Sequence, residues 1–147
     1  MGEVRMKITF LGTSHGITEK NQICSSALVS VGDKHYVIDA GAPIMTLLKN
    51  HDVAYEDVQG IFITHTHEDH MMGLVDFTWQ INCFGCFANV HIPVFVPDEK
   101  RYLEMFRFLF GKPEFRGRVK YLTYGDGVIF DDGTMKVTAI PGGHYPN

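Results

Sequence analysis

Short apolar runs, separated by glycine, proline and aspartate, divide this chain into predicted strands and helices. Single strands are expected at residues 4–11, 60–63, 90–96 and 119–123. Hairpins are expected where Gly32-Asp33-Lys34 joins 25–31 to 35–38, and where Asp131-Asp132-Gly133 joins 128–130 to 135–140. Pro93 interrupts the run 90–96, which predicts either an edge strand or a strand whose pairing begins there.

Apolar residues at three- and four-residue spacing predict helices between these strands, so the fold class is expected to be α/β. The helices are expected at 43–50, within 71–87 and at 97–111. Their apolar faces are Ile44, Leu47 and Leu48, then Leu74, Phe77, Ile81 and Phe84, then Tyr102, Met105, Phe106 and Leu109. Trp79 falls off the second face, so it either covers another apolar surface or lines the mouth of a site.

Composition excludes several classes of protein. A chain of 147 residues with 45% hydrophobic residues is expected to form one domain with its own core. The formal net charge is −4 and like charges form no block, which counts against a dedicated RNA-binding surface. The densest basic stretch, Lys112 to Lys120, is interpreted as a solvated loop.

The start of the chain and its cysteines bear on the compartment. The first residues lead into a strand and not into a signal-peptide apolar region, and no run of about 18 apolar residues predicts a membrane span, so a cytoplasmic protein is expected. Three cysteines without a secretory signal argue against a disulfide framework. Cys83 and Cys86 form a single C-x-x-C, which without a second pair is weak evidence for zinc or redox chemistry.

The candidate chemistry lies directly after the strand 60–63. His65 and His67 are two residues apart on extended backbone, so their side chains point the same way and can hold one ion. Asp69 and His70 follow, and a turn there would aim them at a second, neighbouring ion. Imidazole and carboxylate ligands without thiolate favour zinc, with manganese or ferrous iron as alternatives. A scattered histidine is more often solvated, but three of the eight histidines fall within these six residues.

The segment Thr64-His65-Thr66-His67-Glu68-Asp69-His70 resembles the T-H-x-H-x-D-H signature of the metallo-β-lactamase superfamily, most of whose members are zinc-dependent hydrolases. Three further stretches agree with the family's pattern. They are Thr9 to Ser14, which is similar to the opening of the branch of tRNA 3′-processing nucleases and phosphodiesterases, Tyr36 to Gly41, and Pro141 to His144. The resemblance implies the N-terminal part of a four-layer αββα sandwich, with a largely mixed or antiparallel sheet and flanking helices.

The resemblance also implies roles for individual residues. His65, His67 and His144 are assigned to the first ion, and Asp69 and His70 to the second. Asp69 is also expected to handle a proton during attack, as in the nuclease branch. Asp39 is expected to accept the second N–H of a ligand histidine, against the alternative of a surface turn aspartate. Ser14 and His15 either reach the substrate or are turn residues with an exposed histidine.

The chain departs from the family's pattern after His144. The second half of the family's fold donates a metal-bridging aspartate and a final histidine, and neither has a counterpart before Asn147. We therefore expect a single metallo-β-lactamase-like domain, 1–147, that lacks the C-terminal half and has an incomplete second site. Three alternatives would explain the missing ligands: a gene product cut short, a half-domain that pairs with another copy, or a metal-binding remnant. A sheet without its partner sheet would expose apolar surface, so a homo-oligomer that covers the open face is expected.

These features predict a metal-dependent hydrolase that uses a metal-bound hydroxide, with a phosphodiester as the expected substrate, while lactams, thioesters and lactones remain open as substrates. The alternative is a catalytically impaired metal-binding or assembly module. A third hypothesis is an RNA-processing nuclease, which the charge does not favour. The expected partners are a small-molecule or phosphodiester substrate and another copy of the chain, and no membrane.

Overall fold

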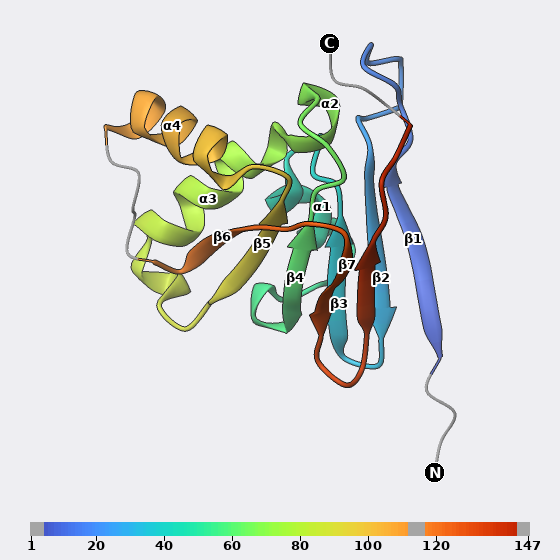
Figure 1. The fold of residues 1–147 in the computed structure, drawn as a ribbon. Coiled ribbons are helices and arrows are strands. Elements are labelled where there is room, and N and C mark those ends of the chain that lie inside the picture. The colour runs from blue at the N-terminus through green and yellow to red at the C-terminus, as the bar shows by residue number, and fades with distance from the viewer. Residues whose placement is uncertain (1–4, 112–116, 144–147) are drawn as a thin grey trace.

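A computed structural model describes residues 5–111 and 117–143, and the main feature of this part of the chain is a six-stranded mixed sheet (Figure 1). The strands stand in chain order: β1 (Met6–Gly12), β2 (Ser26–Val31), β3 (Lys34–Ile38), β4 (Val58–Phe62), β5 (Ile92–Val96) and β6 (Val119–Thr123). The first three are antiparallel neighbours, and β3 to β6 are parallel. The carboxyl ends of four strands therefore meet at one edge.

Each connection between parallel strands contains a helix, because parallel neighbours need a crossover. These helices are α1 (Ile44–Asn50), α2 (Glu68–Met71), α3 (Gly73–Cys83) and α4 (Glu99–Phe110), with short 3-10 turns at Tyr55–Asp57 and Gly85–Phe87. The side chain of Asp98 accepts a hydrogen bond from the N–H of Lys100 at the start of α4. Gly111 ends that helix in the left-handed conformation.

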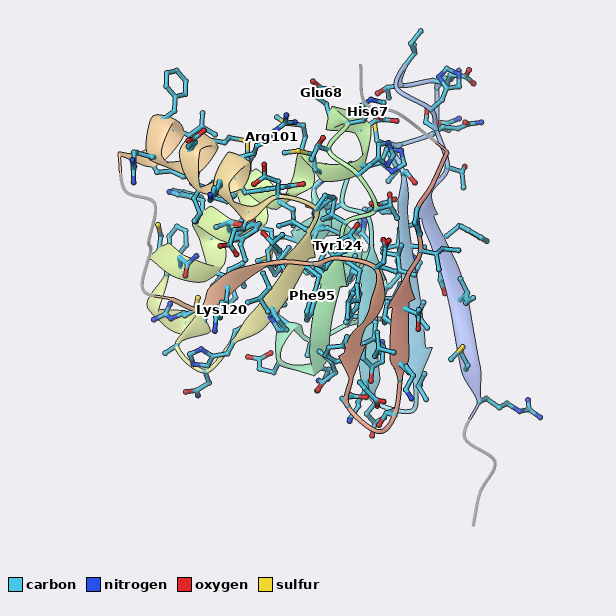
Figure 2. All side chains as sticks on the ribbon, in the orientation of Figure 1. His67, Glu68, Phe95, Arg101, Lys120 and Tyr124 are labelled. Atoms are coloured by element: carbon cyan, nitrogen blue, oxygen red, sulfur yellow. The ribbon has the colours of Figure 1, made fainter. Side chains whose placement is uncertain are left out.

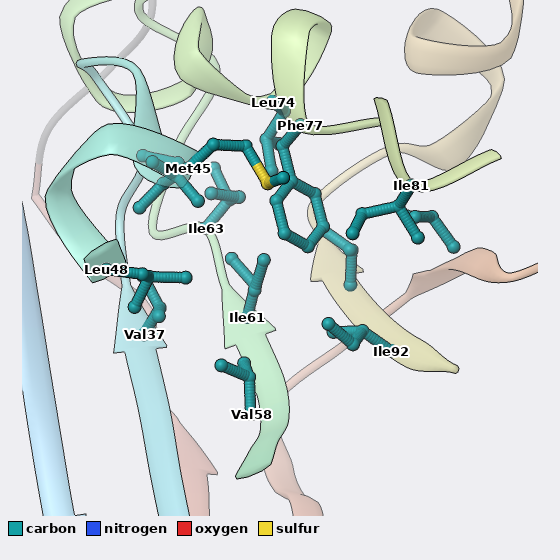
Figure 3. Close-up of a cluster of buried hydrophobic side chains, with 14 of the residues drawn as sticks. Val37, Met45, Leu48, Val58, Ile61, Ile63, Leu74, Phe77, Ile81 and Ile92 are labelled. Atoms are coloured by element: carbon teal, nitrogen blue, oxygen red, sulfur yellow. The ribbon is translucent and has the colours of Figure 1, made fainter. Parts of the chain in front are cut away.

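The main core lies between the sheet and these helices, and Figure 3 shows its centre. Val37, Ile61 and Ile92 point from three neighbouring strands toward Leu48 of α1 and Phe77 of α3, and all five are almost completely buried. Phe77 is fully buried, so its truncation to alanine is expected to cost about 3–5 kcal/mol. This core fixes the sheet edge from which the candidate ligands project.

The opposite face of the sheet is partly covered by a hairpin of β7 (Gly127–Asp131) and β8 (Lys136–Ala139), drawn in red in Figure 1. Phe130 packs edge-on against Phe62 and Phe95, with ring centroids 5.4 and 5.7 Å away. At the hairpin turn, Asp132 accepts hydrogen bonds from the Tyr36 hydroxyl at 2.8 Å and the Lys34 ammonium at 3.0 Å. We call Lys34, Tyr36 and Asp132 the hairpin clamp.

The predicted fold class is confirmed, and each predicted strand, hairpin and helix has a counterpart. Pro93 does not mark an edge strand, because β5 lies inside the sheet. The alternative, that strand pairing begins at Pro93, applies to the side of β5 that faces β4, where pairing begins at Val94.

Two predictions at the ends of helices and one in the basic stretch Lys112 to Lys120 were wrong. Phe84 is 45% exposed and leaves the apolar face of α3, because this helix ends at Cys83. Leu109 is 46% exposed and lies outside the buried face of α4. Arg118 is not solvated: its guanidinium is buried and donates to the carbonyls of Ile81 and Phe84 at the end of α3. Pairing of this kind satisfies carbonyls that a helix end leaves without partners.

Apolar residues of β1 remain uncovered. Met6, Ile8 and Phe10 are 59, 57 and 72% exposed. They stand opposite Val31, Val29 and Ala27 of β2, on the sheet face that carries the hairpin. Across residues 5–111 and 117–143, no helix has the length and apolar character that crossing a membrane requires.

Candidate metal site at the carboxyl edge of the parallel strands

The segment that follows β4 carries four of the five predicted ligands. Thr64 to His67 follow β4 without regular secondary structure, and His67, whose backbone is extended, precedes the first turn of α2. Asp69 and His70 lie in α2, so the chain turns between the two predicted ligand pairs. This is the carboxyl end of a parallel strand, where open α/β sheets generally bind ligands.

The imidazoles of His65 and His67 approach each other closely. His65 Nε2 lies 3.2 Å from His67 Nδ1. Two nitrogen ligands that bind one zinc tetrahedrally at about 2.0–2.1 Å lie about 3.3 Å apart, so the observed spacing fits a shared cation. The same contact also fits a hydrogen bond between one protonated and one unprotonated ring nitrogen.

Asp69 and His70 form a second pair of donors beside the first. His70 Nε2 lies 3.5 Å from Asp69 Oδ2, and the ring centroid of His70 is 4.0 Å from that of His65. About one fifth of each side chain of the Asp69–His70 pair is exposed, so a small ligand can reach both. A nitrogen and a carboxylate oxygen at this separation also suit one divalent ion.

Asp39 is a buried residue whose carboxylate contacts the site, and it is not a surface turn residue. Its carboxylate accepts from His70 Nδ1 at 2.7 Å, from the Thr64 N–H at 2.8 Å and from the Thr64 hydroxyl. Because a carboxylate only accepts, this contact assigns the proton to Nδ1 of His70 and leaves an unprotonated Nε2, which could bind a metal ion, on the side of Asp69. The predicted hydrogen bond between Asp39 and a histidine of the site is therefore present, whereas metal binding by that histidine stays a prediction.

Asp39 makes this contact from a strained backbone conformation. The residue is 5% exposed and its φ is 59°, in the left-handed region that few residues other than glycine adopt. The following residues dock on α2, since the Ala40 N–H donates to the His70 carbonyl at 2.7 Å. A Cβ at Gly41 would lie 1.7 Å from the Asp69 carbonyl oxygen, so only glycine fits there.

The loop after β1 also reaches the site. A Cβ built on Gly16 would stand 3.9 Å from the Asp69 carboxylate. Ser14 is buried, and its hydroxyl donates to the Ile17 carbonyl at 2.7 Å, which makes it a residue that shapes this loop. His15 is exposed, and its Nε2 lies 3.4 Å from a carboxylate oxygen of Glu19. The loop is beside the site, as the resemblance implies.

The sequence analysis missed Tyr124, which follows β6 at the same edge (Figure 2). Its hydroxyl donates to the carbonyls of Ile63 and Thr64 at 2.7 and 3.0 Å and so fixes the start of the ligand segment. Burial, and to a smaller extent the Asp39 carboxylate, raise the pKa of Tyr124, which keeps its hydroxyl protonated. No local pattern distinguishes this tyrosine; only the parallel order of the strands could have suggested it.

The two donor pairs do not complete a metal site in the part of the chain that the structure describes. Within residues 5–111 and 117–143, no group of three histidine, cysteine, aspartate or glutamate side chains is arranged to hold an ion. The predicted third ligand of the first ion, His144, lies outside the described residues. The assignment of His65, His67, Asp69, His70 and His144 as ligands therefore stays a prediction, which the types and spacing of the donors fit.

The cysteine pair and Trp79, which the sequence analysis also considered for a site, lie away from the two donor pairs. Cys83 and Cys86 stand at the far end of α3 as free thiols, half-buried and exposed respectively. Trp79 is 40% exposed and packs edge-on against the exposed Phe84, with ring centroids 5.2 Å apart.

Residues 6–97 match the family model of the Anti-Pycsar protein Apyc1. The chain belongs to this family. The match spans β1 to β5 and contains four of the five predicted ligands. The expected third histidine lies beyond it.

Comparisons with single proteins confirm the predicted place in the metallo-β-lactamase superfamily, close to its tRNA-processing branch. The chain is 29% identical over 139 residues to ribonuclease Z of Cyanothece sp., which covers 92% of this chain and 43% of that protein. It is 27% identical to ribonuclease Z of Leuconostoc mesenteroides, and that alignment covers 95% of this chain and 45% of the relative. The chain thus spans less than half the length of these relatives.

Solved structures agree on the fold. The metallo-β-lactamase fold protein YhfI of Bacillus subtilis superposes with a TM-score of 0.67 at 21% identity, over 86% of this chain and 49% of YhfI. The short form of human tRNase Z superposes with a TM-score of 0.62 at 22% identity, over 80% and 44%. The fold is therefore shared, and dependence on a divalent metal is implied by the superfamily.

Proposed function

We propose that residues 65–70 form the ligand segment of a divalent-metal centre in a hydrolase that cleaves phosphodiester bonds. His65, His67 and His144 hold one ion in this proposal, and Asp69 and His70 hold a second. Zinc is the proposed metal, with manganese or iron as alternatives. The observation that carries the proposal is the approach of two donor pairs, His65–His67 at 3.2 Å and Asp69–His70 at 3.5 Å, at the carboxyl edge of the sheet.

The residues around these pairs fit hydrolysis. A bound divalent ion lowers the pKa of water toward about 7 and polarises the bond under attack. Asp39 fixes the orientation of His70, and Tyr124 fixes the backbone of Thr64. Asp69 is proposed to accept a proton from the attacking water, since its carboxylate is partly exposed and lies beside the loop after β1.

The proposed bond class comes from the relatives. Two proteins named ribonuclease Z match more than nine tenths of this chain, and a ribonuclease acts on phosphodiester bonds. The net charge of −4 supports a small phosphodiester as the substrate more than a long RNA, because RNA binding relies on cationic surface. Marked weakening of RNA binding with added salt would favour the RNA-processing alternative instead.

The proposal is tested by metal content and turnover of the full chain. We expect two divalent ions per chain by mass spectrometry and hydrolysis of bis(p-nitrophenyl) phosphate. His67→Ala is expected to lose one ion and to reduce turnover by at least about 100-fold. His91→Ala is the matched control, because His91 is exposed and precedes β5 outside the site.

The opposite results would favour the alternative, a metal-binding or assembly module without turnover. One ion or none, together with no hydrolysis in zinc, manganese or iron, would contradict the enzyme. Equal loss of activity in His67→Ala and His91→Ala would show that the histidines act through folding alone.

We also propose that residues 1–147 form one domain that associates with a second copy through the uncovered face of β1. The support is the exposed row Met6, Ile8 and Phe10 on an edge strand. Light scattering at micromolar concentration should give the molar mass of a dimer or a larger oligomer. Phe10→Ser should shift this molar mass toward that of the monomer. A monomeric wild-type chain would refute this part of the proposal.

A further inference from the structure

Thr64, the residue directly before the ligand segment, makes two side-chain contacts whose directions depend on each other. Its hydroxyl oxygen lies 2.9 and 3.0 Å from the two carboxylate oxygens of Asp39, and 3.0 Å from Nδ1 of His65. A threonine hydroxyl has one proton to donate and can also accept, whereas an ionised carboxylate only accepts. The hydroxyl therefore donates to Asp39, and its oxygen accepts from Nδ1 of His65. We call the chain Asp39–Thr64–His65 the Thr64 bridge.

The backbone of Thr64 is held on both sides, so the position of its hydroxyl is well defined. The Thr64 N–H donates to Asp39 at 2.8 Å, and the Thr64 carbonyl accepts from the Tyr124 hydroxyl at 3.0 Å. The side chain of threonine is branched at Cβ and has few rotamers. The fold thus places the hydroxyl between Asp39 and His65.

The Thr64 bridge determines which nitrogen of His65 carries the proton. A neutral imidazole has one N–H, so a proton on Nδ1 leaves Nε2 unprotonated. Nε2 is the atom of His65 that lies 3.2 Å from His67 Nδ1, on the side of the first predicted ion. Metal ions bind the unprotonated nitrogen of a neutral imidazole. The bridge therefore leaves His65 in the tautomer that a metal ion between His65 and His67 requires.

The same carboxylate also acts on the second donor pair, and there it does so directly. Asp39 accepts from Nδ1 of His70 at 2.7 Å, and the residue is only 5% exposed. His70 is thereby left with an unprotonated Nε2, as His65 is. One nearly buried acceptor is thus connected to one histidine of each donor pair, to His70 by a single hydrogen bond and to His65 by two.

We propose that Thr64 is a positioning residue through which Asp39 sets the tautomer of His65, so that one carboxylate orients a histidine in both donor pairs. The inference rests on the proposed function for the metal ions, but the tautomers themselves are defined without metal. It predicts that the first ion depends on Asp39 and on the Thr64 hydroxyl, whereas the second depends on Asp39 alone.

NMR of the imidazole nitrogens in the metal-free full chain measures the tautomers directly. The wild type should carry the proton on Nδ1 in both His65 and His70. Thr64→Val keeps the shape of the side chain but removes the acceptor, so the proton of His65 should move partly or wholly to Nε2, while His70 stays unchanged. Thr64→Ser restores a hydroxyl and should restore the wild-type tautomer. His35 is the internal reference, since its Nδ1 contacts the Ser30 hydroxyl at 2.8 Å, away from the site.

Zinc titration against a chelating dye tests the consequence for metal binding. Thr64→Val should weaken the binding of one ion by about 10- to 100-fold and leave the other unchanged, because only His65 depends on the hydroxyl. Thr64→Ser should bind both ions like the wild type. Thr138→Val, the same substitution at an exposed position of β8, is the matched control. Equal weakening of both ions in Thr64→Val, or wild-type affinity for both, would overturn the proposal.

The wild-type spectrum decides the matter even where Thr64→Val does not fold. A proton on Nε2 of His65 in the metal-free wild type would mean that the Thr64 hydroxyl donates to His65, and would overturn the bridge as described. An unchanged His65 tautomer in a folded Thr64→Val would overturn it as well, because another group would then set that tautomer.

Failure of the Thr64 bridge and failure of the proposed function remain distinct. Two bound ions and turnover of bis(p-nitrophenyl) phosphate, with the His65 tautomer unchanged in Thr64→Val, would leave the hydrolase without this bridge. The expected tautomers in the wild type and in both Thr64 variants, without turnover in any metal, would leave the bridge without the hydrolase.

Discussion

Asp39 and Asp132 anchor the two opposite ends of β3, and each carboxylate accepts several hydrogen bonds. Asp132, in the hairpin clamp, accepts from the Lys34 ammonium, the Tyr36 hydroxyl and backbone N–H groups of its own turn. Asp39 instead accepts from the His70 imidazole of the ligand segment and from Thr64, directly before that segment, and its own backbone is left-handed. The first carboxylate joins two layers of the fold, whereas the second orients a group that is expected to bind metal. The partners of each aspartate distinguish a structural contact from a contact with the candidate site.

The largest expected effect concerns the backbone that supports Asp39. Gly41→Ala would place a Cβ 1.7 Å from the Asp69 carbonyl oxygen, so β3 and α2 must move apart. We expect a loss of about 3 kcal/mol or more in the free energy of unfolding, measured by urea denaturation. Gly85→Ala is the control, since its Cβ would meet nothing within 4 Å. Similar losses in both variants would contradict the close approach.

Asp39→Asn tests the site end of β3. The amide can accept from Thr64, but it no longer offers a charged acceptor to His70 Nδ1. We expect metal affinity to fall by about 10- to 100-fold, measured by competition with a chelating dye. Asp33→Asn, in the exposed turn before β3, should bind metal like the wild type. Unchanged affinity in Asp39→Asn would remove the distinction between the two aspartates.

The hairpin clamp should respond to pH and not to metal. The pKa of Asp132 lies below its usual range because its carboxylate accepts several hydrogen bonds. The N–H of Met135 contributes most, and Lys34, Tyr36 and the N–H of Thr134 add to it. A lowered pKa stabilises the fold fully above about pH 4, and this contribution is lost as the pH falls through the folded-state pKa. Asp132→Asn should therefore lower the unfolding temperature at pH 7 by about 3–6 °C and flatten its decline in acid.

Tyr36 gives the alkaline counterpart of that prediction. Burial, and then the bond to Asp132, raise the pKa of Tyr36 to about 12. A raised pKa stabilises the fold fully below about pH 10, and the contribution is lost as the pH rises toward 12. Tyr36→Phe should lose about 1 kcal/mol near neutral pH and decline less steeply than the wild type between pH 10 and 12. Parallel alkaline curves for the two proteins would contradict the assignment.

The smallest effect is expected at Lys34. Its side chain is 39% exposed, and its ammonium bonds to Asp132 and to the Thr134 hydroxyl. Lys34→Gln should cost about 0.5 kcal/mol in the free energy of unfolding, and the difference should shrink in 1 M salt. A larger cost that is insensitive to salt would place Lys34 with the buried partners of the hairpin clamp.

The sequence predicted the elements well where one face of a strand or helix is buried. The apolar spacing of Leu74, Phe77 and Ile81 identified α3, but it could not show that the helix stops before Phe84. That end is fixed by Arg118, which is 34 residues from Phe84 and caps the carbonyls of Ile81 and Phe84. Such caps depend on contacts between distant segments, which a local pattern does not contain.

By itself, the sequence determined which residues are the candidates for the chemistry. The T-H-x-H-x-D-H segment follows an apolar strand, and alternation on extended backbone places His65 and His67 on one side whatever the rest of the chain does. Only the tertiary structure decided what surrounds that segment. Parallel order of β3 to β6 brings Asp39 and Tyr124 to the same edge, from positions separated by 85 residues (39 to 124). The physical reason is that spacing of two or four residues fixes directions along one element, whereas neighbours across a sheet are chosen by the packing of the whole core.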